Sequence, residues 1–158
     1  LRTQMLTATT GEAVMAHRFT EYKPWKGPIP GRNNGVLISK IQDKTTAYSI
    51  DKLQDRGTFF VDPAEDVYAG QIVAENVKPG DLIVNVTEQK KLTNHRASGS
   101  DAATNIAPKT LMTLEECMEY IQQDECIEVT PNAIRMRKVI LDEEERKKEA
   151  KRMSAEAV

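Results

Sequence analysis

The sequence predicts an α+β fold: a mainly β, barrel-like domain with one or two short helices and a long basic loop. Three observations carry this prediction. Short segments rich in β-branched residues recur between turn-forming residues, as in compact β domains. One helix has a strong start signal at Thr113. Residues 23–31 hold three prolines and two glycines, which oppose helix and sheet alike and mark a linker within the 158-residue chain.

The strands are predicted from apolar patterns and turn signals. Residues 12–22 alternate in places, with Met15, His17 and Phe19 on one face. Beyond the linker, the polar residues 42–44 are expected to turn a hairpin, and Pro-Gly within residues 78–80 suits a type II turn. A single helical turn is expected at residues 53–57. The other predicted strands are 35–41 and 45–50 in the hairpin, 58–61, 71–77, 81–86, 127–129 and 134–141.

The helix after Thr113 is defined at its start and along one face. Thr113 and Glu116 have the capping-box spacing, in which each side chain bonds the other residue's backbone N–H. One apolar stripe follows at i, i+3, i+4 and i+7: Leu114, Cys117, Met118 and Ile121. Cys117 is therefore predicted to be a core residue rather than a nucleophile.

Residues 142–158 are almost wholly charged, and we expect a helical or disordered tail exposed to solvent. Favourable i, i+4 pairs support the helical form: Asp142 with Arg146, Glu143 with Lys147, and Glu144 with Lys148.

Composition and motifs exclude several classes of function. No apolar run approaches the roughly 20 residues of a membrane-spanning helix, and two cysteines make no disulfide framework. His17 and His95 lack a second His or a Cys at metal-ligand spacing. Neither a phosphate-binding P-loop nor a G-x-S-x-G elbow occurs, so we expect no enzymatic activity in these residues. The polar start lacks a signal peptide, and we expect a cytoplasmic fragment that begins inside a longer protein.

The stretch from Thr87 to Thr110 is predicted to be a functional loop, because it shows no sustained period over a length that compact domains seldom leave irregular. Its cations can neutralise phosphates, and its hydroxyl, amide and imidazole groups can bond to phosphates, 2′-hydroxyls or base edges. The alternative is a polar surface loop without a ligand. The candidate RNA-binding residues are Lys90, Lys91, Thr93, Asn94, His95, Arg96 and Ser98.

The last predicted strand carries a second basic group. Arg135 and Arg137 alternate with apolar residues, so both guanidinium groups are expected to project from one face, next to Lys138. The alternative is the solvated face of an edge strand, where positive charge discourages aggregation.

The formal net charge of −2 hides a segregated distribution. Residues 23–40, 89–96 and 131–141 hold ten of the 22 basic residues and none of the 24 acidic ones. Three of these cations, Lys23, Lys26 and Arg32, lie in or directly after the linker near Trp25, and Trp25 is expected either to stack on a base or to pack between domains. The near-neutral sum therefore does not exclude a nucleic-acid partner.

Eight short strings, in order along nearly the whole chain up to about Arg146, resemble the C-terminal part of the TypA/BipA translational GTPases, which are related to elongation factor G. One string alone is weak, but eight in order are specific. The strings are Gly11-Glu-Ala-Val-Met15, Phe19-Thr-Glu-Tyr22, Asn34-Gly-Val-Leu-Ile-Ser39, Leu53-Gln-Asp-Arg-Gly57, Val67-Tyr-Ala-Gly-Gln71, Lys91-Leu-Thr-Asn94, Arg96-Ala-Ser-Gly99 and Glu128-Val-Thr-Pro131.

The resemblance implies three parts. Residues 1–30 would be the end of a ferredoxin-like α/β domain, which corresponds to the fifth domain of elongation factor G, plus the linker. Residues 31–141 would be the family-specific C-terminal domain, and residues 142–158 the charged tail. GTP and Mg²⁺ would bind in a GTPase domain upstream, and no cofactor is expected in this chain.

The resemblance also implies partners: the ribosome, through large-subunit rRNA and A-site tRNA, and the upstream domains of the same chain, with no membrane. The basic loop would make the RNA contacts, with Arg135, Arg137 and Lys138 as supporting cations. The expected roles are stress adaptation and ribosome biogenesis. The alternative is a protein-interaction or regulatory domain of the same GTPase with no direct RNA contact.

Overall fold

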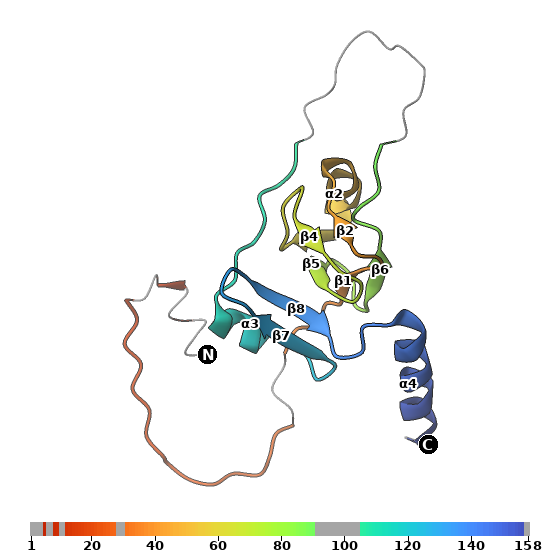
Figure 1. Ribbon diagram of the computed structural model, residues 1–158. Coiled ribbons are helices and arrows are strands. Elements are labelled where there is room, and N and C mark those ends of the chain that lie inside the picture. Colours follow the sequence, from red (N-terminus) through yellow and green to blue (C-terminus); the bar gives the residue numbers. More distant parts are fainter. Residues whose placement is uncertain (1–4, 6–7, 10–11, 28–30, 91–104, 157–158) are drawn as a thin grey trace.

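The computed structural model describes residues 5, 8–9, 12–27, 31–90 and 105–156 (Figure 1). The predicted α+β class is confirmed, because short helices accompany a mainly β body. The described strands form one four-stranded sheet and two two-stranded sheets, and their pairings leave the larger sheet open.

The four-stranded sheet contains, in spatial order, β3 (Gly57–Phe59), β5 (Ile72–Asn76), β1 (Val36–Ser39) and β6 (Leu82–Val84). The central strand β1 is antiparallel to β5 and parallel to β6. Successive side chains of a strand point to opposite faces. Accordingly, Leu37 lies in one hydrophobic cluster while Val36 and Ile38 lie in a second, so both faces of the sheet are covered.

The connection from β5 to β6 crosses the start of β1. The backbone N–H of Gly35 donates to the carbonyl of Lys78 at 3.1 Å, and that of Val36 donates to the Asp81 carboxylate at 3.0 Å. Gly80 has a φ of +94°, as the predicted Pro-Gly turn requires. A Cβ atom on Gly35 would lie 1.9 Å from the carbonyl oxygen of Gly80, so any larger residue at position 35 would force this crossing to shift.

The predicted helix after Thr113 is confirmed as α3 (Leu114–Tyr120). The Thr113 hydroxyl accepts from the Glu116 N–H at 3.3 Å, and the Glu116 carboxylate accepts from the Thr113 N–H at 2.8 Å. Cys117 is buried in the second cluster, as expected of a core residue. A hairpin packs beside it, formed by β7 (Glu125–Val129) and β8 (Ile134–Lys138).

The predicted strand at residues 45–50 is wrong. Thr46 instead caps α2 (Ala47–Leu53), accepting from the Ser49 N–H at 3.1 Å. The helix continues into a 3₁₀ turn, η1 (Gln54–Arg56), where the single helical turn was predicted. A Thr that satisfies the first N–H groups of a helix outweighs the β-branched and aromatic composition of this short segment.

The predicted hairpin of residues 35–41 and 45–50 is therefore also wrong. The short strand β2 (Asp43–Lys44) pairs with β4 (Asp66–Val67), far along the chain. β1 pairs with β5 and β6 instead.

The two ends of the described chain depart from the sheet in different ways. None of residues 12–22 is in a strand, which contradicts the prediction; this segment is extended and largely exposed, and no described strand lies alongside to form a ladder with it. The charged tail forms α4 (Glu143–Glu156). Of the predicted i, i+4 pairs, Glu143 and Lys147 are joined at 2.5 Å, whereas Arg146 donates to the carbonyl of Leu141 at 2.6 Å.

Candidate nucleic-acid interface

The predicted RNA-binding loop leaves the described body next to α2. Lys90 lies within the predicted loop, is exposed, and is the last described residue before position 91. In Figure 1 both stems of the loop rise beside α2, at the end of the domain opposite to the β7–β8 hairpin. The other loop residues of the prediction lie outside the described residues: Lys91, Thr93, Asn94, His95, Arg96 and Ser98.

The N-terminal end of α2 holds the first stem of the loop. The Thr46 N–H donates to the carbonyl of Val86 at 3.0 Å, and its hydroxyl donates to the carbonyl of Glu88 at 2.5 Å. The buried hydroxyl of Ser49 also bonds to the carbonyl of Val86. One helix cap therefore also fixes the backbone that leads into the loop.

The second stem is held by Gln54, at the other end of α2. Its amide N–H donates to the carbonyl of Asn105 at 3.3 Å, and its amide oxygen accepts from the N–H of Ala107 at 3.4 Å. Ile106 packs against the first hydrophobic cluster, and the Thr110 N–H donates to the carbonyl of Phe59 at 2.8 Å. Both stems are thus anchored to the same helix and sheet.

The outer face of α2 adds two residues that the sequence analysis missed, since it predicted a strand there. Tyr48 has 38% of its surface exposed. The Lys52 ammonium lies 5.9 Å from the centre of the Tyr48 ring and forms an exposed ion pair at 3.1 Å with Glu88, on the first stem. An aromatic face beside a cation can stack on a base while the cation neutralises phosphate.

Arg135 and Arg137 share one face of β8, as predicted, and both are half-buried. Arg135 lies opposite Glu128 on β7, whose carboxylate accepts a hydrogen bond from the Tyr68 hydroxyl at 2.6 Å. Burial and then this bond raise the pKa of Tyr68, although Arg137 and Arg135 oppose the shift. Because β8 and the first stem of the loop lie at opposite ends of the domain (Figure 1), the structure does not bring the two arginines of β8 close to the loop.

Lys138 lies on the opposite face of β8 and is only 1% exposed. Its ammonium contacts the carboxylates of Asp81, Asp124 and Glu125 at 2.6, 2.7 and 3.0 Å. Burial alone would lower the pKa of Lys138, but the hydrogen bonds to Asp124, Asp81 and Glu125 outweigh it and raise the pKa. A cation so enclosed cannot reach RNA, and we withdraw Lys138 from the supporting cations.

Arg32, which the sequence analysis placed in a basic linker patch, joins the same buried network. Its guanidinium binds both carboxylate oxygens of Glu125, at 2.7 and 3.1 Å, and lies 4.5 Å from the centre of the Tyr120 ring. Trp25, by contrast, is 83% exposed, and within the described residues it forms no aromatic pair.

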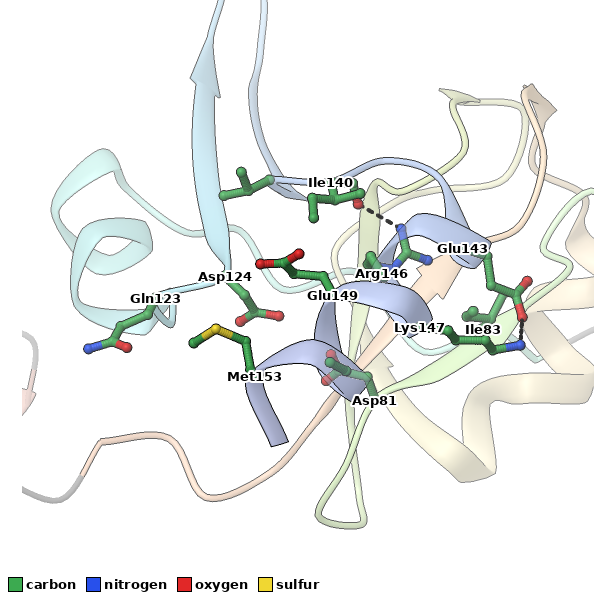
Figure 2. Close-up of a pocket in the computed structure, with 12 residues that line it drawn as sticks. Asp81, Ile83, Gln123, Asp124, Ile140, Glu143, Arg146, Lys147, Glu149 and Met153 are labelled. Carbon is green, nitrogen blue, oxygen red and sulfur yellow. Dashed lines mark hydrogen bonds and ion pairs between the residues drawn. The ribbon is translucent and has the colours of Figure 1, made fainter. Parts of the chain in front are cut away.

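The hollows on the described surface include the following three. One of about 300 Å³ lies at the second stem, between η1, β3 and residues 106–108. Another of about 570 Å³ lies between residues 109–112 and the tip of the β7–β8 hairpin. The third, of about 510 Å³, lies between α4 and the body; Figure 2 shows Met153 and Glu149 of α4 turned toward Asp124 and Ile140 across it.

No group of three or more His, Cys, Asp or Glu side chains in the described ranges could hold a metal ion.

The model of the TypA/BipA C-terminal domain matches residues 34–143. The chain belongs to the TypA/BipA family. It is 44% identical over 151 residues to the large ribosomal subunit assembly factor BipA of Bacillus subtilis (strain 168). The matched region is 95% of this chain and 25% of the relative. The domain boundaries at residues 30/31 and 141/142 remain predictions, because the family match over residues 34–143 does not test them.

Two further relatives carry the same name. The one from Escherichia coli (strain K12) is 43% identical over 148 residues, covering 93% of this chain and 24% of the relative. The one from Synechocystis (strain ATCC 27184 / PCC 6803 / Kazusa) is 40% identical over 138 residues, covering 87% and 23%. The chain thus spans about a quarter of the length of the curated relatives it matches. No helix among the described residues has both the length and the apolar character needed to cross a membrane.

Proposed function

We propose that this chain is the ribosome-binding C-terminal region of a translational GTPase that acts in large-subunit biogenesis and stress adaptation in the cytoplasm. The observation that carries the proposal is the identity of 40–44% to large ribosomal subunit assembly factors over 87–95% of the chain. GTP and Mg²⁺ would be held by a domain outside these residues. A GTP turnover assay on this chain alone should accordingly read zero.

The proposed contacts are large-subunit rRNA and A-site tRNA, bound by the basic loop and the outer face of α2. Exposed Lys90 at the root of the loop supports this assignment, as do Tyr48 and Lys52 beside it. Arg135 and Arg137 would support a separate RNA segment at the hairpin end of the domain. Phosphate contacts position the RNA, and the aromatic ring adds stacking that tolerates any sequence.

Ribosome co-sedimentation over a series of salt concentrations tests the loop. Full-length protein with Lys90, Lys91 and Arg96 changed to Ala should bind more weakly. The slope of log affinity against log salt should flatten by about 0.7–0.9 for each lost phosphate contact. A matched variant with three exposed cations elsewhere changed to Ala, Lys78, Lys148 and Lys151, should keep both affinity and slope. Unchanged binding and slope in the loop variant would overturn the RNA contact.

One observation favours the second candidate, a protein-interaction or regulatory domain. The hollow of about 570 Å³ has a rim of exposed apolar side chains: Leu111, Val129 and Ile134. Apolar rims of this kind are typical of protein contacts. RNase treatment separates the two candidates, because a protein partner remains bound after RNA is destroyed, whereas loop-bound RNA does not.

A further inference from the structure

The hollow at the second stem of the loop is small and mixed in character. Its volume of about 300 Å³ is at the lower limit for ligand pockets, which suits a single ring system. Ile50, Phe59, Ile106 and Pro108 supply apolar walls, while Asp55 and Thr58 supply polar groups. Residues 106–108 follow the basic loop directly, so this hollow lies at the root of the loop.

The backbone of β3 presents unpaired polar groups along this wall. Phe60 donates its N–H to Val73 of β5, so in an antiparallel ladder Phe59 and Gly57 direct their backbone groups away from β5. The carbonyl of Phe59 indeed accepts from Thr110. The N–H of Phe59 and the carbonyl of Gly57 have no hydrogen-bond partner among the described residues, although both residues are buried. Buried backbone groups are almost always paired, so this donor and this acceptor call for a partner.

Two side chains at the rim extend this pattern. The Asp55 carboxylate and the Thr58 hydroxyl are exposed, and neither has a hydrogen-bond partner within the described parts of the chain. A carboxylate only accepts hydrogen bonds, so it selects groups that donate. An added peptide strand fits poorly here, because β3 is three residues long and Thr110 already occupies one end of its edge.

We propose that this hollow, defined by Asp55, Gly57, Thr58, Phe59 and residues 106–108, binds one unstacked nucleobase that carries an exocyclic amino group. The apolar walls hold the ring, and the backbone N–H of Phe59 and carbonyl of Gly57 pair with its edge. The Asp55 carboxylate accepts from the amino group, which adenine, cytosine and guanine have and uracil lacks. Single-stranded RNA is read in this way, by splayed bases whose edges meet backbone and side-chain groups. The inference rests on the proposed RNA-binding function and adds a base preference to it.

Fluorescence anisotropy with three labelled RNAs of equal length tests the pocket. Full-length protein should bind oligo(A) and oligo(C) at least about fivefold more tightly than oligo(U) at one fixed salt concentration. Asp55→Ala should abolish that difference by weakening oligo(A) and oligo(C). Glu119→Ala removes an exposed carboxylate on α3 and should preserve the preference. Because Asp55 is exposed and has no partner among the described residues, Asp55→Ala should keep the fold, as circular dichroism can verify.

Each other outcome overturns the proposal in a distinguishable way. Equal affinity of the wild type for all three RNAs, with a salt slope that still depends on Lys90, would discard the pocket and keep the RNA-binding function. A uniform gain in affinity in Asp55→Ala would mean that the carboxylate merely repels phosphate. Absence of binding to every RNA at low salt would discard both the pocket and the proposed function.

Discussion

The Glu125 carboxylate receives two parallel hydrogen bonds from the Arg32 guanidinium, at 2.7 and 3.1 Å, across 93 residues of sequence. Both side chains are almost wholly buried, and Glu125 also contacts Lys138 at 3.0 Å. Arg32 directly follows the proline-rich linker of residues 23–31, and Glu125 is the first residue of β7. The pair therefore ties the chain that follows the linker to the β7–β8 hairpin.

Arg32→Ala should destabilise the chain by about 3–5 kcal/mol, because it leaves the buried Glu125 carboxylate without its main partner. Arg32→Lys keeps the charge but cannot form the two-pronged contact, so it should recover only part of the loss. Urea unfolding measures the free energy of unfolding. Arg56→Ala, at an exposed position without a side-chain partner in the described chain, is the control and should change it by no more than about 0.5 kcal/mol. If Arg32→Ala and Arg56→Ala lowered the free energy of unfolding by the same small amount, the pair of Arg32 and Glu125 would not contribute to stability.

Lys138 should make stability depend on pH in the alkaline range. Hydrogen bonds to the surrounding carboxylates outweigh burial and raise its folded pKa above the ordinary lysine value. A raised folded pKa stabilises the fold fully below the unfolded pKa of about 10.4, and this contribution is lost as pH rises through the folded pKa. Lys138→Met should therefore lower the free energy of unfolding by about 3–5 kcal/mol at pH 7. The difference in this free energy between the wild type and Lys138→Met should narrow only above about pH 10.4.

Urea unfolding at pH 7, 9 and 11 measures this difference in the free energy of unfolding. Lys148→Met, on the exposed face of α4, serves as the control and should track the wild type throughout. A difference in free energy of unfolding that narrows between pH 7 and 9, or that stays constant up to pH 11, would contradict the assigned direction of the pKa shift.

Gly35→Ala should be destabilising and Gly31→Ala should not. A Cβ atom at position 35 would lie 1.9 Å from the carbonyl oxygen of Gly80, so the β5–β6 connection would have to shift, at a cost of about 1–3 kcal/mol or more. At position 31 a Cβ atom would meet nothing within 4 Å. Thermal unfolding of the two variants compares them directly. Equal melting temperatures would mean that the crossing can relax freely.

The sequence predicted those elements whose signals are local. The capping box of Thr113 and Glu116 specifies α3 through its own side chains, and the apolar run of β1 marks a strand that is buried on both faces. By contrast, the local cap that Thr46 gives to α2 competes with a strand-like composition, and the bonds from Thr46 and Ser49 to residues 86–88 that also hold this helix cannot be read from a local pattern. The segment of residues 45–50, whose β-branched members are Thr45, Thr46 and Ile50, is ambiguous until those distant partners are known.

The site followed the same rule. The alternation along β8 correctly put Arg135 and Arg137 on one face. The opposite role of Lys138 depends on Asp81, Asp124 and Glu125, which come from other elements, so spacing alone could not separate a buried cation from a surface one. Tyr48 and Lys52 were missed for the related reason that a helix, and not a strand, places them four residues apart on one face.

Tyr48 and Lys52 should affect RNA binding in different ways. Tyr48→Ala removes the exposed ring and should weaken single-stranded RNA binding by about 1–3 kcal/mol for a stacked base, with the salt slope unchanged. Tyr48→Phe retains the ring and should bind as the wild type does. Lys52→Ala removes one cation, so its slope of log affinity against log salt should flatten by about 0.7–0.9.

Anisotropy titrations of the three variants at several salt concentrations separate these effects. Because Lys52 is paired with Glu88 in the free protein, RNA must displace that carboxylate. Glu88→Gln should therefore tighten binding slightly while leaving the Tyr48 contribution intact. If Tyr48→Ala changed only the slope, or Lys52→Ala changed affinity equally at every salt concentration, the roles assigned to the ring and the ammonium would be wrong, and α2 would serve only to anchor the loop.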